Sequence, residues 1–498
     1  MSGGAWLPLL VLASSLFAGL IIFALPEASQ RLRSSLNLAA ALAKLGLVAM
    51  MLWGVYLGQQ YEARYTLMPG IDFVLRADAL AMLLVTLSAV LWLFTTVYAI
   101  GYLEGSPHRS RFFGFFSLCV TATMGLALAG NLFTFFMFYE LLTLSTYPLV
   151  VHRGTGQALR AGKLYLGYTL TGGAVLLVGI IWLHGLAGNV EFVHGGALSN
   201  LDPALHGELV LIFILLIAGL GVKAALVPLH GWLPVAMVAP APVSALLHAV
   251  AVVKAGAFGI VRVVYEVYGI EFAADLNLLL PLAVVASITI VYGSLRALSQ
   301  NDLKKRLAYS TVSQVSYIVL GTSLFGPVGT IGGLVHLAHQ GIMKITLFFC
   351  AGNLAETLHI HRVSEMNGVG RRMPWTMTAF TIAAFGMIGV PPMAGFISKW
   401  YLGLGALNSG MDWVLLVLVA STLLNAAYFL PVLHAAWFKP QQGPWPEEKP
   451  RGQFETSAWL LLPPLITAAL TIAVGLFAAL AISPLEWARI ITLREYVR

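Results

Sequence analysis

The run of residues 132–150, LFTFFMFYELLTLSTYPLV, contains a single carboxylate, Glu140, near its middle. The run is long enough to cross a membrane as one helix, so this side chain lies far from both surfaces. A charged group at mid-membrane costs at least ~2.5 kcal/mol on insertion scales. Such a residue is retained for pairing, for contact with water, or for function, and the transfer of ions or protons is the chemistry that suits it.

Five lysines also lie inside predicted spans, and no other acidic residue lies as deep as Glu140, so one static ion pair cannot account for the set. Burial disfavours a charged amine, and a nearby carboxylate favours it again. A buried lysine whose acidic partner changes state is therefore a switchable proton site. Lys44 lies about two turns inside its span, and we expect its side chain to snorkel to the surface. The other four are Lys223, Lys254, Lys344 and Lys399.

Histidines accompany two of these lysines. His248 precedes Lys254 on one predicted span, and HLAHQGIMK places His336 and His339 shortly before Lys344. Residues three apart share a helix face, and imidazoles titrate near neutral pH, so these side chains could relay protons between lysines. A metal site is not expected, because no cysteine or carboxylate stands at a suitable spacing. The sequence also has no motif for a cofactor or a redox centre of its own.

The composition indicates a membrane protein. The chain of 498 residues is 59% hydrophobic and only 10% charged, with a mean hydropathy of +0.85, whereas soluble proteins are about 25% charged. The net charge of +7 is read as a topology signal and not as a sign of nucleic-acid binding. We predict an all-α polytopic membrane protein with about fourteen spans, each of roughly 20 residues. The approximate spans are 5–25, 36–57, 79–102, 112–129, 131–151, 163–186, 208–228, 243–265, 276–299, 306–324, 329–355, 375–404, 412–438 and 456–482.

Prolines predict breaks near the seventh and within the twelfth span. Pro228 and Pro234 follow Lys223, and Pro391 and Pro392 precede Lys399. Proline removes a backbone donor, and in lipid the freed carbonyls are tolerated only where protein or a water cavity satisfies them. Paired interrupted helices in the two halves of a transporter indicate the transport site.

The two breaks lie five spans apart, which predicts two five-helix repeats made of spans 4–8 and 9–13. The corresponding parts of the chain are a three-helix segment 1–111, the repeats 112–267 and 268–440, and a last helix with its tail, 441–498. Most Lys and Arg residues lie in the loops after odd-numbered spans. The positive-inside rule therefore predicts that these loops are cytoplasmic and that both termini are external, as in a multi-pass protein of a bacterial inner membrane.

Two stretches carry a family resemblance. WLPVAMVAPAPVSALLHAVAVVKAG and NDLKKRLAYSTVSQVSY resemble signature stretches of the proton-conducting membrane subunits. This family includes the antiporter-like subunits of respiratory complex I, subunits A and D of Mrp-type Na⁺/H⁺ antiporters, and equivalents in membrane-bound hydrogenases. The resemblance extends over roughly residues 80–450. It implies fourteen helices, inverted five-helix repeats, and broken seventh and twelfth helices.

The resemblance also implies a path for protons. Glu140 matches a glutamate that tunes the lysine at position 223, and Lys399 matches the residue at the exit of the twelfth helix. Many members have an acidic residue at the position of Val235. The middle complex I subunit typically has glutamate where Lys399 stands. This combination of residues most resembles the D-type members of the Mrp antiporters. The path implied by the resemblance comprises Glu140, Lys163, Lys223, His248, Lys254, His336, Lys344 and Lys399.

We therefore expect a subunit of a larger complex that translocates protons, or protons in exchange for Na⁺. Its expected partners are other membrane subunits, including further antiporter-like subunits, and the lipid bilayer. The sequence leaves two alternatives open: a self-contained secondary transporter of a small solute, and a structural membrane scaffold. A scaffold would not need the charged side chains, and a secondary transporter would work as the isolated chain.

Overall fold

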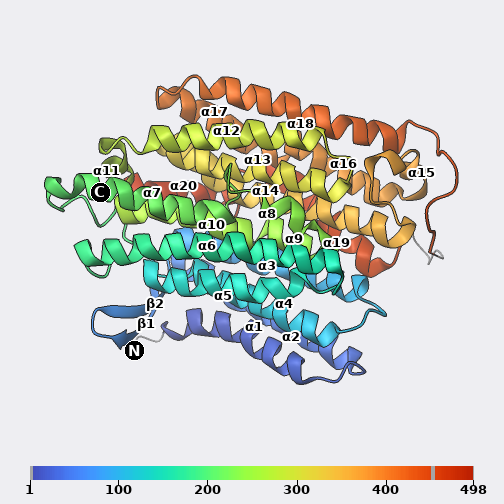
Figure 1. Ribbon diagram of the computed structural model, residues 1–498, viewed down its shortest axis with the longest axis horizontal. Helices are drawn as coiled ribbons and strands as arrows, with labels where there is room; N and C mark the ends of the chain where they lie inside the picture. Colours follow the sequence, from blue (N-terminus) through green and yellow to red (C-terminus); the bar gives the residue numbers. More distant parts are fainter. Residues whose placement is uncertain (1–3, 450–454, 497–498) are drawn as a thin grey trace.

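Long helices run side by side through the whole molecule (Figure 1). The structure is a computed structural model that describes residues 4–449 and 455–496. Its first part consists of α1 (Trp6–Ala24), α2 (Gln30–Tyr56), β1 (Tyr61–Met68), β2 (Ile71–Ala77), α3 (Ala79–Tyr102), α4 (Arg109–Ala127), α5 (Leu132–Val150), α6 (Gly156–Ala187), α7 (His206–Lys223), α8 (Trp232–Val235), α9 (Ala241–Ala249) and α10 (Val252–Arg262), which continues as a π-helix (Val263–Tyr268). Its second part consists of α11 (Ile270–Asp275), α12 (Leu279–Leu298), α13 (Leu303–Ser323), α14 (Pro327–Leu358), α15 (Val369–Arg372), α16 (Pro374–Ile388), α17 (Ala394–Asn408), α18 (Val414–Trp437), α19 (Ala458–Leu476) and α20 (Pro484–Tyr496).

The prediction of a helical, multi-pass membrane protein is confirmed. Among the described residues, twelve helical segments are long and apolar enough to span a membrane. Two of the predicted spans are not among them: α13 is too polar, and the twelfth is divided between the short helices α16 and α17. The total of fourteen spans and the limits of the two repeats stay predictions.

Three interruptions separate helices in the predicted spans. Helix α7 ends at Lys223, and the chain turns through Pro228 before the short α8. Pro391 and Pro392 lie in the gap between α16 and α17. The third gap separates α9 from α10, within the segment Ala241–Tyr268 that matches the predicted span 243–265. No proline or glycine marks that gap, which is why the sequence did not reveal it.

Two peripheral elements were not predicted. The antiparallel hairpin β1–β2 pairs Tyr61 with Ala77 and is the one sheet in the part of the chain that the structure describes. Helix α20 docks on the bundle where a tail was expected. Its Trp487 Nε1 donates a hydrogen bond to Ala79 O at the start of α3 (2.8 Å), and Tyr496 Oη lies 2.9 Å from Thr330 Oγ1 of α14.

The end of α7 is held by a close backbone contact with α10. A Cβ atom added to Gly256 would lie only 2.2 Å from Ala224 N and 2.6 Å from Leu220 O. Real Cβ atoms do not approach backbone so closely, so only glycine fits here without a shift of one helix. This contact fixes the broken end of α7, and with it Lys223, against α10.

Replacing Gly256 with alanine should therefore lower the melting temperature of the purified protein, because overpacking a tight contact typically costs about 1–3 kcal/mol. Gly167→Ala on α6 is the matched control, since its added Cβ would have no neighbouring atom within 4 Å. Thermal unfolding in detergent compares the two variants. Equal melting temperatures would contradict the close approach of α7 and α10.

Candidate functional site

Lys223 lies at the carboxyl end of α7, where the helix stops. Its side chain is fully buried, and its ammonium group donates a hydrogen bond to the backbone carbonyl of Tyr139 on α5. The same nitrogen lies 3.3 Å from the centroid of the Tyr139 ring. A helix carboxyl end carries partial negative charge, and an aromatic face attracts cations, so both features stabilise the protonated lysine.

Glu140 follows Tyr139 on α5 and lies within electrostatic range of Lys223. The residue is partly exposed on the surface of the chain, but its Oε1 atom is buried and has no hydrogen-bond partner among the described residues. The carboxylate rests on Gly173 of α6, where an added Cβ would lie 2.1 Å from Oε1. Gly173 thus makes the space that lets the carboxylate stay beside the end of α7.

His248 and Lys254 lie on either side of the gap between α9 and α10, and both are fully buried. The His248 ring stacks on Phe348 of α14 at a centroid distance of 4.4 Å. Lys254 Nζ donates to Leu337 O, also on α14, at 2.8 Å. The gap resolves a spacing problem in the sequence, because residues six apart on one ideal helix would not share a face.

Helix α14 supplies the next two groups. His336 Nδ1 is 2.8 Å from Ser398 Oγ of α17, and its ring stacks on Tyr317. Lys344 Nζ donates to Ser310 Oγ at 2.6 Å. Both residues are fully buried and lie within electrostatic range of Lys254. His339, one turn from His336, is fully buried as well.

Lys399 lies beside the break between α16 and α17. Its Nζ donates to the carbonyl of Ile388, the last residue of α16, at 2.7 Å and to Thr422 Oγ1 of α18 at 3.0 Å. The side chain packs on Gly389 within the break. The lysine therefore satisfies a carbonyl that the interruption of the helix leaves free, and it remains partly exposed.

A hydrogen-bonded side branch was not predicted from the sequence. Ser310 Oγ, which accepts from Lys344, lies 2.7 Å from Tyr428 Oη; Tyr428 donates to Asn425 Oδ1 at 2.6 Å. Asn425 in turn donates to Met387 O at the end of α16 (3.1 Å). The signal in the sequence was the pair Asn425 and Tyr428, three residues apart in an apolar span.

The side chains described above form a series that begins at Glu140 and ends at Lys399. Solvent exposure distinguishes the two ends of this series from its middle. Glu140 on α5 and Lys399 on α17 are partly exposed, and these helices lie in the lower and upper parts of the molecule in Figure 1. The groups between them are fully buried: Lys223, His248, Lys254, His336 and Lys344.

Two lysines do not fit the expectations. Lys163 is exposed on α6, and the structure does not bring it into the buried series. Lys44 is fully buried and donates to Ser15 Oγ at 2.6 Å, so the prediction that it snorkels to the surface is wrong.

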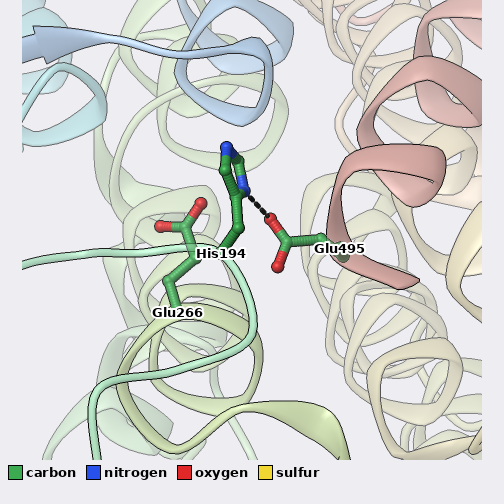
Figure 2. A group of neighbouring side chains, drawn as sticks. All are labelled: His194, Glu266 and Glu495. Carbon is green, nitrogen blue, oxygen red and sulfur yellow. Dashed lines mark hydrogen bonds and ion pairs between the residues drawn. The ribbon is translucent and has the colours of Figure 1, made fainter. Parts of the chain in front are cut away.

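Figure 2 shows a second group of charged side chains, beside α20. His194 of the α6–α7 connection, Glu266 of the π-helix and Glu495 of α20 point toward one another, with His194 Nδ1 donating to Glu495 Oε1 at 2.7 Å. Arg262 pairs with Glu266 and with Asp78 Oδ2, the latter at 2.8 Å. Because this permanent cation already neutralises carboxylates in the group, the arrangement suits an ion-pair network that fixes α20 better than it suits a metal site.

Residues 129–425 match the family model described as NADH:quinone oxidoreductase/Mrp antiporter, TM. The chain belongs to this family. NADH-quinone oxidoreductase subunit N of Desulforudis audaxviator is 36% identical over 489 residues, which cover 95% of this chain and 96% of that protein. The family resemblance drawn from the two sequence stretches is therefore confirmed.

Two solved complexes contain chains of the same fold. A chain of the Mrp complex from Dietzia sp. DQ12-45-1b superposes with a TM-score of 0.88 and 25% identity, over 100% of this chain and 98% of that one. A chain of the membrane-bound sulfane sulfur reductase, an archaeal respiratory membrane complex, gives a TM-score of 0.86 and 26% identity, over 99% and 96%. The roles of the individual residues stay predictions.

The contact between His194 and Glu495 should make the docking of α20 depend on pH. The hydrogen bond that His194 donates to Glu495 raises the pKa of the half-exposed His194 imidazole above its ordinary value, with burial opposing. A raised pKa means that the contact stabilises docking fully below the ordinary pKa of about 6.5 and loses that effect as pH rises through the raised value. The other charged groups facing it, Glu266, Arg262 and Asp78, remain in the His194→Ala variant.

Hydrogen exchange of the α20 amides, expressed as protection factors over a series of rising pH that starts below the ordinary pKa of about 6.5, checks this prediction. Protection in the wild type should fall as the pH rises, and His194→Ala should show weak protection throughout. His184→Ala, a histidine outside this group, serves as the control and should behave as the wild type. A pH profile of His194→Ala that matches the wild type would show that other groups control α20.

Proposed function

We propose that this chain is a proton-translocating subunit of a larger membrane complex, in which protons move along the buried series from Glu140 to Lys399. One observation carries the proposal. Among the described residues, the lysines of the series have no carboxylate in contact, and each is held by neutral oxygens. Those acceptors are Tyr139 O for Lys223, Leu337 O for Lys254, Ser310 Oγ for Lys344 and Ile388 O for Lys399.

Neutral acceptors leave the protonation state free to change. A lysine donates a hydrogen bond to a carbonyl both as an ammonium and as a neutral amine, so the loss of a proton does not break the contact that positions it. A salt bridge would instead hold the proton. The side chains can therefore exchange protons while the helices that carry them stay in place.

Glu140 acts on this series through its charge. An ionised Glu140 favours protonated Lys223, and its neutralisation or displacement favours release of the proton to the next group, His248 or Lys254. The proton then passes to His336, which lies within electrostatic range of both Lys254 and Lys399. It leaves through Lys399. Each step moves one proton from a donor nitrogen to an acceptor nitrogen, directly or through water.

The two partly exposed ends suit contacts with other subunits. Relatives of this fold occur in the Mrp complex and in the membrane-bound sulfane sulfur reductase. We place Glu140 and Lys399 at contacts with neighbouring membrane subunits, where a change of charge in one subunit is felt by the next. Exchange for Na⁺ is compatible with the same series. Both termini are placed on the external side, as the distribution of Lys and Arg indicates.

Glu140→Gln and Lys223→Ala should each abolish coupled proton translocation while the complex still assembles, because one removes the tuning charge and the other the tuned site. Gly173→Ala should also slow translocation, since its methyl group displaces the Glu140 carboxylate. Pumping or antiport in vesicles with the purified complexes measures the effect. Gly167→Ala on the same helix is the matched control and should translocate normally; normal transport by Glu140→Gln or Lys223→Ala would refute the assigned roles.

Lys399 should require a titratable side chain. Lys399→Arg should be impaired because guanidinium does not release its proton, Lys399→Glu should be partly active, and Lys399→Ala should be inactive. The same vesicle assay ranks the three variants. Wild-type rates in Lys399→Arg would make Lys399 a fixed charge that caps α16, and the proton exit would then have to be sought at His336 or Lys344.

The orientation is tested with a reporter that is active only in the cytoplasm, fused to the carboxyl terminus. We expect no reporter activity, and a fusion in the loop between α5 and α6, which carries Arg153, should be active. The opposite pattern would invert the topology and the direction of the proposed path.

A further inference from the structure

Lys44 lies outside the series described above, within a group formed by α1, α2, α3 and α4. It is fully buried, its Nζ donates to Ser15 Oγ of α1 (2.6 Å), and it lies 5.0 Å from the centroid of the Trp92 ring on α3. The sequences of α1 to α4 contain no aspartate or glutamate. A permanently charged lysine in such surroundings would be costly, so its proton must be able to leave or its charge must be hydrated.

Polar side chains connect Lys44 to one end of this helix group. Ser15 Oγ lies 2.7 Å from Thr121 Oγ1 of α4. Near the amino-terminal end of α2, Arg33 Nη1 donates a hydrogen bond to Ser110 Oγ, also on α4, at 2.8 Å. Lys44 follows Arg33 by eleven residues, and Thr121 follows Ser110 by the same number. On both α2 and α4, the contact around Lys44 therefore lies about 16 Å along the helix from the contact between Arg33 and Ser110.

Between these two contacts lie buried polar atoms that have no hydrogen-bond partner among the described residues. Asn37 Oδ1 lies one turn after Arg33 on α2, and Ser117 Oγ lies one turn before Thr121 on α4. Trp92 Nε1 and Thr96 Oγ1, one turn apart on α3, are also unpaired. Because buried polar groups are costly without hydrogen bonds and take internal water as partners, this pattern indicates a hydrated path between the helices.

Along α2, the buried polar residues lie on the Arg33 side of Lys44. On the same face of α2, the buried residues beyond Lys44 are Val48, Met51, Gly54 and Val55, which offer no polar side chain. On α3, Ser88 Oγ is a single unpaired atom one turn beyond Trp92 on this far side. Polar groups are therefore concentrated on the Arg33 side, from which we expect water and protons to reach Lys44. By the orientation proposed above, the Arg33 side is cytoplasmic.

We propose that Lys44 is a second proton-binding site, reached from the Arg33 side through the hydrated path formed by Asn37, Ser117, Thr121 and Ser15. The site binds and releases one proton at Nζ and lies apart from the series that runs from Glu140 to Lys399. It is a branch entered from the Arg33 side, since the buried residues of α2 beyond Lys44 are apolar.

Cysteine accessibility tests the path in the assembled complex. Cys119 and Cys350 are first replaced by serine, and single cysteines are placed at Asn37, Ser117 and Val48. A small membrane-impermeant methanethiosulfonate should modify Asn37→Cys and Ser117→Cys from the Arg33 side only, and Val48→Cys should stay unmodified. Inert cysteines at positions 37 and 117, or equal labelling of all three, would overturn the hydrated path. This result does not depend on transport, so it stands or falls separately from the function of the main series.

Substitutions of Lys44 test the proton exchange. Lys44→Met and Lys44→Arg should both slow proton uptake by vesicles severalfold, because neither side chain exchanges a proton. Lys44→His should restore uptake with a pH profile shifted toward neutrality. Wild-type uptake in Lys44→Arg would make the residue a fixed charge, and wild-type uptake in Lys44→Met would leave it without a role; both results overturn the proposal. If the variants do not assemble, the cysteine result decides.

Discussion

In lipid, a backbone carbonyl that a broken helix leaves free needs a partner inside the protein. This constraint organises the centre of the molecule. Lys399 donates to the last carbonyl of α16, Lys223 stands at the last turn of α7, and Lys254 donates to a carbonyl of α14. At the break after α16 the amine itself satisfies the free carbonyl, whereas at the end of α7 the Trp232 indole donates to Val222 O. Lys223 and Lys254, which lie beside breaks, donate to carbonyls of the continuous helices α5 and α14. Each break thus places a buried amine beside backbone that needs polar partners, which explains why charge and broken helices occur together.

The breaks that proline marks could be predicted from the sequence, and so could the lysines beside them, because a missing backbone donor is a local property of the chain. The gap between α9 and α10 has no such mark and depends on packing. The direction in which Lys44 points was also not predictable, since its span is apolar on all sides. The branch through Ser310, Tyr428 and Asn425 joins separate helices, and hydroxyl and amide groups in apolar spans do not reveal their partners. The hairpin β1–β2 was missed because it lies between two strong helical patterns.

The positions of charge also divide the molecule by function. The groups that keep neutral acceptors lie in the middle of the bundle, where protonation can change without the loss of a contact. Arg262, by contrast, is buried between two carboxylates, Glu266 and Asp78, which hold a cation that never loses its proton. Arginine with carboxylates thus forms ion pairs at one end, whereas the lysines at the centre have carbonyl and hydroxyl acceptors, the arrangement on which the proposed proton exchange rests.

The docking of α20 has a consequence for biogenesis. Trp487 meets Ala79 across 408 positions of sequence, and Arg494 meets Val55 across 439. Helices α2 and α3 must therefore enter the bilayer long before the ribosome has synthesised the segment that covers their ends. During that interval the start of α3 and the end of α2 lack the contacts that α20 later makes, so the growing chain passes through an incompletely packed state. Packing at this end of the bundle is therefore completed only after α20 has been synthesised.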